Sequence, residues 1–208
     1  VGDIWGSFSR SLMLGLMVMV TTVVVSIMGG LAFRKKFAGS GILFQLIITS
    51  LVIPSILISL GVGLIFSQTG LKVHWATSGF GSQLTWTLPF GLLIMFAVFN
   101  RFDKSYEEAA RDQGASNWQT IRHVVLPIIA PSLIGVALFG FTLSYDEFAR
   151  TLLTAGSRNT LPLEIFGMTT NVTTPVIFAL GTLTTVFSFA IIGVFLISAR
   201  VMNRRRAR

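Results

Sequence analysis

The chain has 208 residues, of which 52% are hydrophobic and only 12% are charged, and Lys and Arg exceed Asp and Glu by 16 to 8. The mean hydropathy of +0.77 reflects more apolar side chains than the core of a soluble domain of this size requires. The sequence has no cysteine, which excludes disulfides and thiolate metal sites. We expect no metal site, because His74 and His123 stand alone in the sequence.

Five long uncharged runs follow one another along the chain. About 20 apolar residues cross the hydrocarbon layer of a membrane as an α-helix, and each run is long enough to do so. The sequence therefore predicts an all-α polytopic membrane protein whose residues 1–208 form a single transmembrane domain. The predicted spans are residues 11–33, 42–66, 84–100, 124–145 and 176–199.

Two of the predicted spans contain a proline, Pro54 in the second and Pro89 in the third. Proline inside a helix removes a backbone hydrogen bond and bends the helix axis. We expect kinks at both positions, as suits helices that line a cavity and move during gating. The neighbouring glycines Gly29 and Gly30 favour close packing of the first span against another helix.

Basic residues collect in segments 34–41, 101–123 and 200–208, which five spans would place on one side of the membrane. These segments hold twelve of the 16 Lys and Arg residues, namely Arg34, Lys35, Lys36, Arg101, Lys104, Arg111, Arg122, Arg200, Arg204, Arg205, Arg206 and Arg208. Because Lys and Arg concentrate on the cytoplasmic side, we expect the C-terminus to be cytoplasmic. The tail RRRAR is interpreted as an anchor beside anionic lipid headgroups and not as a nucleic-acid site.

The most polar stretch is SYEEAARDQGASNWQTIRHVVLP, residues 105–127, between the third and fourth predicted spans. It predicts a short helix with Glu107 and Glu108 near its start, where the helix dipole favours negative charge. Gly114 suits the end of that helix, and a second helix is expected to begin near Ser116 or Asn117. Composition alone favours a solvated loop between two membrane spans.

The spacing within this stretch resembles a family signature. Glu108-Ala109-Ala110, three residues, Gly114, nine residues and the segment 124–127 fit the pattern E-A-A-x3-G-x9-I-x-L-P, with Val in place of Ile at position 124. This pattern is the EAA loop of permease subunits in bacterial type I ABC importers. Further stretches, such as LAFRKKFAGSG and LSYDEF, resemble the permeases of spermidine/putrescine-type importers.

In that family the loop forms a coupling helix that docks in a cleft of the ATP-hydrolysing subunit. The resemblance implies such a helix at about residues 105–118. The residues that it assigns to contact with the ATPase are Glu107, Glu108, Ala109, Ala110, Asp112, Gly114 and Ala115. The resemblance also implies three protein partners in the bacterial inner membrane: a dimer of ATP-binding subunits, a second permease subunit and a periplasmic substrate-binding protein. Family members usually have six spans, and this chain, which begins with Val1, resembles them from the second span onward, so we expect further sequence upstream.

The sequence has no G-x-x-x-x-G-K-[ST] motif, which ATP-binding subunits use to cradle phosphates. We therefore expect that this chain is not an enzyme and holds no cofactor, and that ATP and Mg²⁺ bind to the partner ATPase. A secondary transporter or channel would need internal repeats or a charged relay within the spans. The sequence has neither feature. A membrane enzyme would need clustered His or acidic residues at the membrane surface, and we assign no catalytic residues.

Acidic and aromatic residues meet near the end of the fourth predicted span. Asp146 and Glu147 follow Pro127 by about 20 residues, a helical rise of roughly 30 Å that crosses the hydrocarbon layer. Acids beside aromatic rings suit an organic cation such as a polyamine, through ion pairing and cation–π attraction. The residues expected along the substrate path are Phe141, Tyr145, Asp146, Glu147 and, before the last span, Glu164. The alternative, that Arg150 pairs locally with the two acids, remains equally open.

Overall fold

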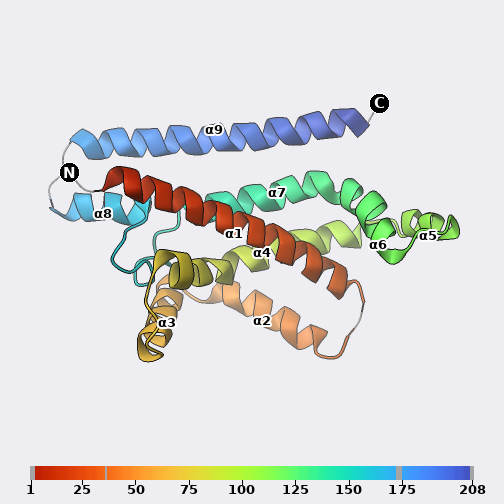
Figure 1. The fold of residues 1–208 in the computed structure, drawn as a ribbon, viewed down its shortest axis with the longest axis horizontal. Helices are drawn as coiled ribbons and strands as arrows, with labels where there is room; N and C mark the ends of the chain where they lie inside the picture. Colours follow the sequence, from red (N-terminus) through yellow and green to blue (C-terminus); the bar gives the residue numbers. More distant parts are fainter. Residues whose placement is uncertain (1–2, 36, 172–174, 207–208) are drawn as a thin grey trace.

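The structure is a computed structural model that describes residues 3–35, 37–171 and 175–206, and every regular element in these residues is helical (Figure 1). This confirms the predicted all-α class. The α-helices in chain order are α1 (Ile4–Phe33), α2 (Ser40–Val52), α3 (Ser55–Gln68), α4 (Phe80–Asn100), α5 (Ser105–Asp112), α6 (Asn117–Thr120), α7 (Leu126–Tyr145), α8 (Leu161–Asn171) and α9 (Pro175–Arg206).

Four helical segments of the described chain are long and apolar enough to cross a membrane, and they agree with four of the five predicted spans. They are Ile4–Phe33, Trp75–Asn100, Asn117–Tyr145 and Pro175–Met202. The second and third of these include the π-helical turns η1 (Trp75–Gly79) and η2 (Ile121–Val125). Each of these segments is longer than the predicted span that it contains. At the start of α1, the Asp3 carboxylate accepts the N–H of Gly6 at 3.0 Å.

The second predicted span, residues 42–66, is not one continuous helix. Its two halves, α2 and α3, meet at a bend of 108°. Pro54 has no N–H to donate, and a residue before proline is pushed away from helical geometry. Ile53 is accordingly extended, with φ −68° and ψ 128°. The predicted kink at Pro54 is therefore a full break, whereas α4 continues through Pro89, where a kink stays a prediction.

Helices α1, α4 and α7 form the centre of the bundle (Figure 1). Small residues allow this close approach, since a Cβ added to Gly30 would lie 2.7 Å from the Phe99 ring. Buried hydroxyls supply further contacts, such as the 3.1 Å hydrogen bond from Thr22 Oγ1 to Thr87 Oγ1. The predicted close packing at Gly29 and Gly30 is confirmed. α9 packs along α7 at the side of this core.

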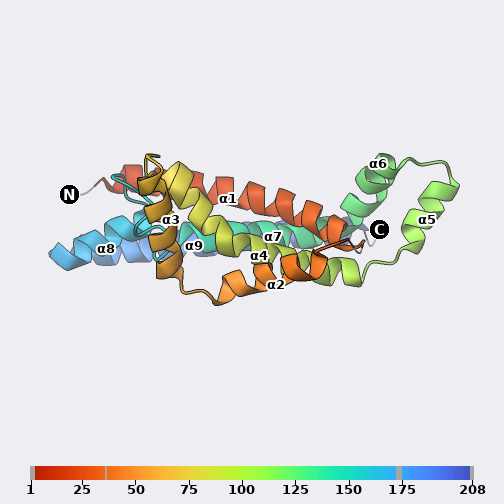
Figure 2. The same cartoon turned by 90° about the horizontal axis from the view of Figure 1, so that it is seen from below.

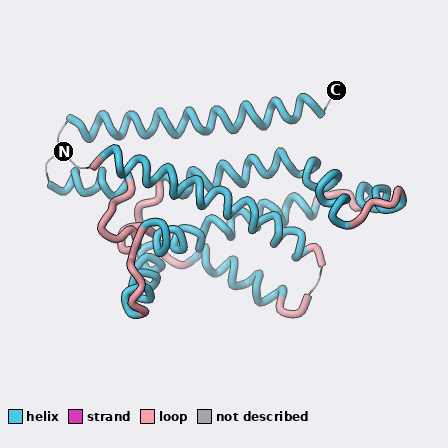
Figure 3. Tube along the Cα trace, viewed as in Figure 1, coloured by secondary structure: helices cyan, strands magenta, loops and turns pink. Residues whose placement is uncertain are grey.

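The bundle has two distinct ends, which the trace in Figure 3 shows most simply. One end carries the α1–α2 connection, α5, α6 and the C-terminal end of α9. The other carries α3, α8 and the start of α1. The described parts of the three basic segments thus lie at the same end, as the charge pattern predicts. The side chains of Lys36 and of 203–208 are outside the described residues, so the lipid anchor stays a prediction.

Candidate functional site

The polar stretch between α4 and α7 projects beyond the end of the bundle (Figure 2). Its first helix, α5, begins where the Asp103 carboxylate accepts the N–H of Ser105 at 2.9 Å. It ends at Asp112, so the coupling helix predicted at about 105–118 is shorter than expected. The remainder of that range forms a turn and the start of a second helix.

Gly114 makes this turn, with φ +82°, a conformation that glycine adopts without strain. The N–H of Gly114 donates to the carbonyl of Arg111 at 2.8 Å, and that of Ala115 donates to the carbonyl of Ala110 at 3.0 Å. These two bonds define a Schellman motif, which satisfies the last carbonyls of α5. The expected helix end at Gly114 is confirmed.

Ser116 begins the second helix with a capping box. The Ser116 hydroxyl accepts the N–H of Gln119 at 3.3 Å, and the Gln119 side chain accepts the N–H of Ser116 at 2.8 Å. Such reciprocal bonds satisfy donors that a helix start otherwise leaves free. The predicted start near Ser116 or Asn117 is confirmed, and the two caps hold α5 and α6 in a defined corner.

The residues predicted to contact an ATPase differ in exposure. Glu108, Ala109, Asp112 and Gly114 are exposed, and Ala110 and Ala115 are half-buried. The exposed glutamate and the small side chains leave the surface of α5 accessible. This exposed set, Glu108, Ala109, Asp112 and Gly114, is called the α5 surface below.

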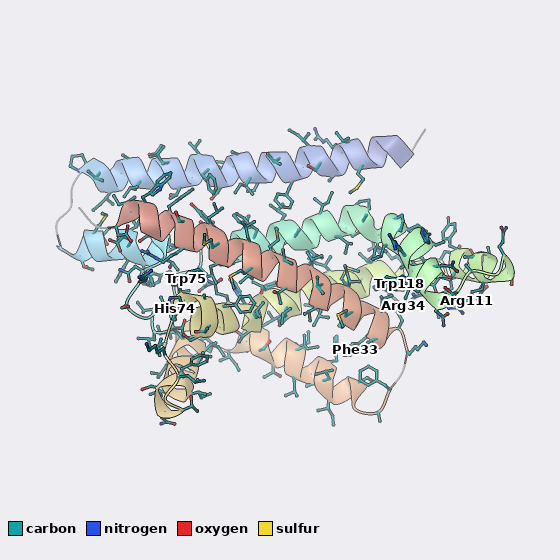
Figure 4. All side chains as sticks on the ribbon, in the orientation of Figure 1. Phe33, Arg34, His74, Trp75, Arg111 and Trp118 are labelled. Atoms are coloured by element: carbon teal, nitrogen blue, oxygen red, sulfur yellow. The ribbon has the colours of Figure 1, made fainter. Side chains whose placement is uncertain are left out.

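Glu107 faces the chain's own bundle. Its Oε1 lies 2.5 Å from Nη1 of Arg34, the residue that follows α1, and its Oε2 lies 3.8 Å from Nη2 of Arg111. Figure 4 shows Arg34 and Arg111 at the same end of the molecule, beside the α5–α6 corner. The structure thus gives Glu107 ion pairs within the chain, whereas its predicted contact with an ATPase stays a prediction.

The opposite end holds a cavity of about 400 Å³ between α7, α8 and α9. Asp146 lines it, and its carboxylate has neither a hydrogen bond nor an ion pair with any described residue. Partial burial raises the pKa of this carboxyl above its ordinary value. Tyr145 also lines the cavity, and its buried hydroxyl has no hydrogen-bond partner in the described chain. The full lining is Tyr145, Asp146, Phe148, Leu161, Pro162, Ile165, Phe166, Thr169 and Thr184.

The other residues expected along a substrate path do not line this cavity. Phe141 is buried against Tyr145, with the rings stacked at a centroid distance of 5.7 Å. Glu147 is buried and accepts the N–H of Arg150 at 2.8 Å. Glu164 accepts a hydrogen bond of 2.9 Å from Asn159 Nδ2. The structure thus brings together Tyr145 and Asp146 of the predicted set, and gives the other three structural contacts.

Arg150 does not form the local ion pair that the sequence left open. Within the described chain the ion pairs join Asp3 with Arg10 and Glu107 with Arg34 and Arg111. The guanidinium of Arg150 instead donates to Thr85 Oγ1 at 3.2 Å and to Ser55 Oγ at 2.5 Å. Sequence reasoning missed this contact, because no local pattern relates positions so far apart. His74 and Trp75 lie at this end too (Figure 4), and the described residues contain no cluster of His, Asp and Glu that could hold a metal.

Comparison with known proteins identifies the architecture. Residues 21–208 match the family described as binding-protein-dependent transport system inner membrane component. The chain is 32% identical to the spermidine/putrescine transport system permease protein PotC of Haemophilus influenzae, over 81% of this chain and 67% of that protein. It is 27% identical to PotC of Escherichia coli, over 82% of this chain and 65% of that protein. The chain therefore spans about two thirds of the length of these relatives.

Two further similarities bear on substrate and fold. The trehalose/maltose transport system permease protein MalG of Thermococcus litoralis is 30% identical, over 75% of this chain and 57% of that protein. A chain of the MetNI methionine ABC transporter in an inward-facing conformation has a TM-score of 0.71 at 16% identity, covering 96% of this chain and 94% of that chain. The latter shows a shared fold. From the family match over 21–208, we conclude that the chain belongs to the inner membrane components of binding-protein-dependent transport systems, the permeases of ABC importers.

Proposed function

We propose that this chain forms, with a second permease subunit, the membrane path of an ATP-driven importer for a small solute. The observation that carries the proposal is the α5 surface, which projects beyond the spanning helices and bears the E-A-A-x3-G pattern. A dimer of ATP-binding subunits docks there, binds ATP and Mg²⁺, and moves α5 when ATP is bound. A periplasmic binding protein delivers the solute to the opposite end.

Three properties of the α5 surface suit such docking. Glu108 is exposed in the first turn of α5, where its charge is free to meet a basic group of the ATPase. The methyl side chain of Ala109 permits close approach of another backbone. The Schellman turn at Gly114 fixes the end of the helix, so that a force applied to α5 moves it as a unit.

The substrate that we propose is a polyamine or another small organic cation. The PotC relatives are named for spermidine and putrescine. In this chain Asp146 offers an unpaired carboxylate beside Phe148 and Phe166 in one cavity, and a cation gains both ion pairing and cation–π attraction in such a place.

A second candidate substrate is a neutral sugar, because the MalG relative is 30% identical and is named for trehalose and maltose. Uptake by the complete transporter, reconstituted with its binding protein, distinguishes the two. We expect ATP-dependent uptake of radiolabelled spermidine or putrescine that trehalose does not inhibit. Uptake of trehalose without polyamine uptake would overturn the cation proposal and leave the importer proposal intact.

The coupling role is tested by charge reversal at Glu108. We expect Glu108→Lys to lower ATP-dependent uptake by about tenfold or more, the effect of roughly 1.4 kcal/mol at the docking interface, with unchanged membrane insertion. The matched control is Glu108→Asp, which keeps the negative charge at the same exposed position and should transport normally. Wild-type uptake by Glu108→Lys would refute the docking of an ATPase at the α5 surface.

A further inference from the structure

Glu107 and Arg34 form an ion pair that is largely shielded from solvent. Arg34 Nη1 and Glu107 Oε1 are 2.5 Å apart, and the two side chains are 16% and 12% exposed. Exposed ion pairs contribute little, because water and salt screen them. Breaking a pair that is largely removed from water costs much more, since the remaining charge loses its partner.

Arg34 is also held by α4. Its guanidinium carbon lies 5.1 Å from the centre of the Phe99 ring and 5.3 Å from that of Phe102, within the range of cation–π attraction. Helices α1 and α4 come together one turn earlier, at Gly30 and Phe99. The guanidinium is therefore fixed between the ends of two spanning helices and faces α5.

The rest of α5 is only loosely connected to α1. The closest backbone neighbours of α5 are α6 and η2, which belong to the same polar stretch, and none of the side chains of α5 is fully buried. A cavity of about 540 Å³ lies around the ion pair, between α1, α5 and α6. Because packing is open there, the ion pair provides the firm connection from α5 to α1.

We propose that the Glu107–Arg34 pair is a latch that fixes the orientation of α5 relative to α1, which makes Glu107 a positioning residue and not a contact to the ATPase. The inference rests on the proposed coupling function of α5. When the ATPase moves the α5 surface, the latch passes this movement to α1, which packs against α4 and α7. Without the latch, the ATPase still docks through Glu108, but α5 then moves relative to α1 and the movement does not reach the spanning helices.

The latch predicts a specific defect: ATP hydrolysis continues while transport falls. In proteoliposomes with the complete transporter, we expect Glu107→Arg or Arg34→Glu to lower the number of solute molecules imported per ATP about fivefold, equivalent to roughly 1 kcal/mol. Assembly with the ATPase should be unchanged. The swapped pair Arg34→Glu/Glu107→Arg should recover at least half of the ratio, with a remaining loss because a cation near the start of α5 opposes the helix dipole.

The matched control is Glu108→Arg, a reversal at the neighbouring exposed glutamate. Arg34→Glu should not rescue it, because Glu108 does not face Arg34. If the single variants prevent assembly with the ATPase and the swap restores nothing, Glu107 is an ATPase contact and the latch is wrong. Failure of the proposed function gives a different result, since the wild-type transporter would then show no ATP-dependent uptake.

A covalent version of the latch provides a measurement that does not depend on the swapped variant. The chain has no cysteine, so Arg34→Cys/Glu107→Cys introduces one unique pair of thiols. The uncrosslinked double variant should show the low transport ratio, and a short bifunctional maleimide should raise it. A crosslinked protein that imports no more solute per ATP than the uncrosslinked one would overturn the proposal.

Discussion

The guanidinium carbon of Arg150 lies 4.6 Å from the centre of the Trp86 ring. Arg150 belongs to the segment between α7 and α8, is 2% exposed, and also donates to Ser55 on α3 and Thr85 on α4. A planar guanidinium can stack on a ring and donate to two acceptors at once, which a lysine ammonium does not do equally well. This one side chain therefore ties three parts of the chain together at the end opposite α5.

Replacement of Arg150 by lysine should destabilise the protein. We expect Arg150→Lys to lower the free energy of unfolding by about 2 kcal/mol and the Tm in detergent by about 4–8 °C. Arg158→Lys is the control, since Arg158 is exposed in the same segment and should leave the Tm unchanged. Equal Tm values for both variants would show that the contacts of Arg150 with α3 and α4 contribute nothing to stability.

Replacement of Gly114 should impair the turn because its backbone conformation disfavours residues with a side chain, and not because a side chain would clash with neighbouring atoms. No atom lies within 4 Å of a Cβ added there, but the φ of +82° costs a non-glycine residue roughly 1–2 kcal/mol. Gly114→Ala should therefore lower ATP-dependent uptake severalfold. Gly70 has φ +72° and is equally open, so Gly70→Ala carries the same strain away from the coupling loop. An equal loss of uptake in Gly114→Ala and Gly70→Ala would show that backbone strain anywhere in the chain lowers uptake, and that the turn at Gly114 has no special role.

The carboxylate of Asp146 should control the affinity for a cationic solute. Asp146→Asn should raise the half-saturation concentration for polyamine uptake about fivefold, the effect of roughly 1 kcal/mol for one partly exposed ion pair. Glu147→Gln is the comparison, because Glu147 hydrogen-bonds the backbone of Arg150 and does not line the cavity. Unchanged affinity in Asp146→Asn would remove this residue from the substrate path.

The raised pKa of Asp146 sets the sign of the pH dependence. The carboxyl takes up its proton at a higher pH than an exposed aspartate, and the protonated form has no charge to pair with a cation. The affinity for a polyamine should thus fall as the external pH is lowered, beginning above the ordinary aspartate pKa. Asp146→Asn should abolish this part of the pH profile, which uptake measured between about pH 4 and 7 would reveal. A profile identical in the two proteins would contradict the assignment.

The orientation can be tested with single cysteines, because the chain has none of its own. Asp112 ends α5 and Ser157 lies in the segment between α7 and α8, and both are exposed. These two parts of the chain lie at opposite ends of the bundle (Figure 1). If α5 is cytoplasmic, a membrane-impermeant maleimide added to intact cells should label Ser157→Cys and leave Asp112→Cys unlabelled. Labelling of Asp112→Cys alone would reverse the orientation derived from the basic residues.

The helical spans and the fold of the polar stretch between α4 and α7 could be predicted because both follow from local patterns. Uncharged runs mark the hydrocarbon layer, and the positions of Glu108, Gly114 and Ser116 determine a helix, a turn and a cap within a few residues of sequence. The range of about 105–118 that the resemblance implies for the coupling helix is longer than α5, because it also includes the Schellman turn at Gly114 and the start of α6.

The contacts between distant residues could not be predicted in the same way. Glu107 lies 73 residues from Arg34, and which of two adjacent glutamates faces the bundle depends on the rotation of α5 about its axis. Arg150 could equally have paired with its neighbours Asp146 and Glu147. It donates hydrogen bonds to Ser55 and Thr85 instead, because the fold brings α3 and α4 next to it.

The break at Pro54 has a consequence for the surrounding membrane. α2 has 13 residues and is about 20 Å long, whereas the hydrocarbon layer is about 30 Å thick. If α2 begins at the membrane surface, the corner between α2 and α3 lies within the hydrocarbon layer, where lipid tails cannot satisfy the backbone groups freed by the proline. A thinned bilayer or an adjoining protein at that face would then satisfy these backbone groups.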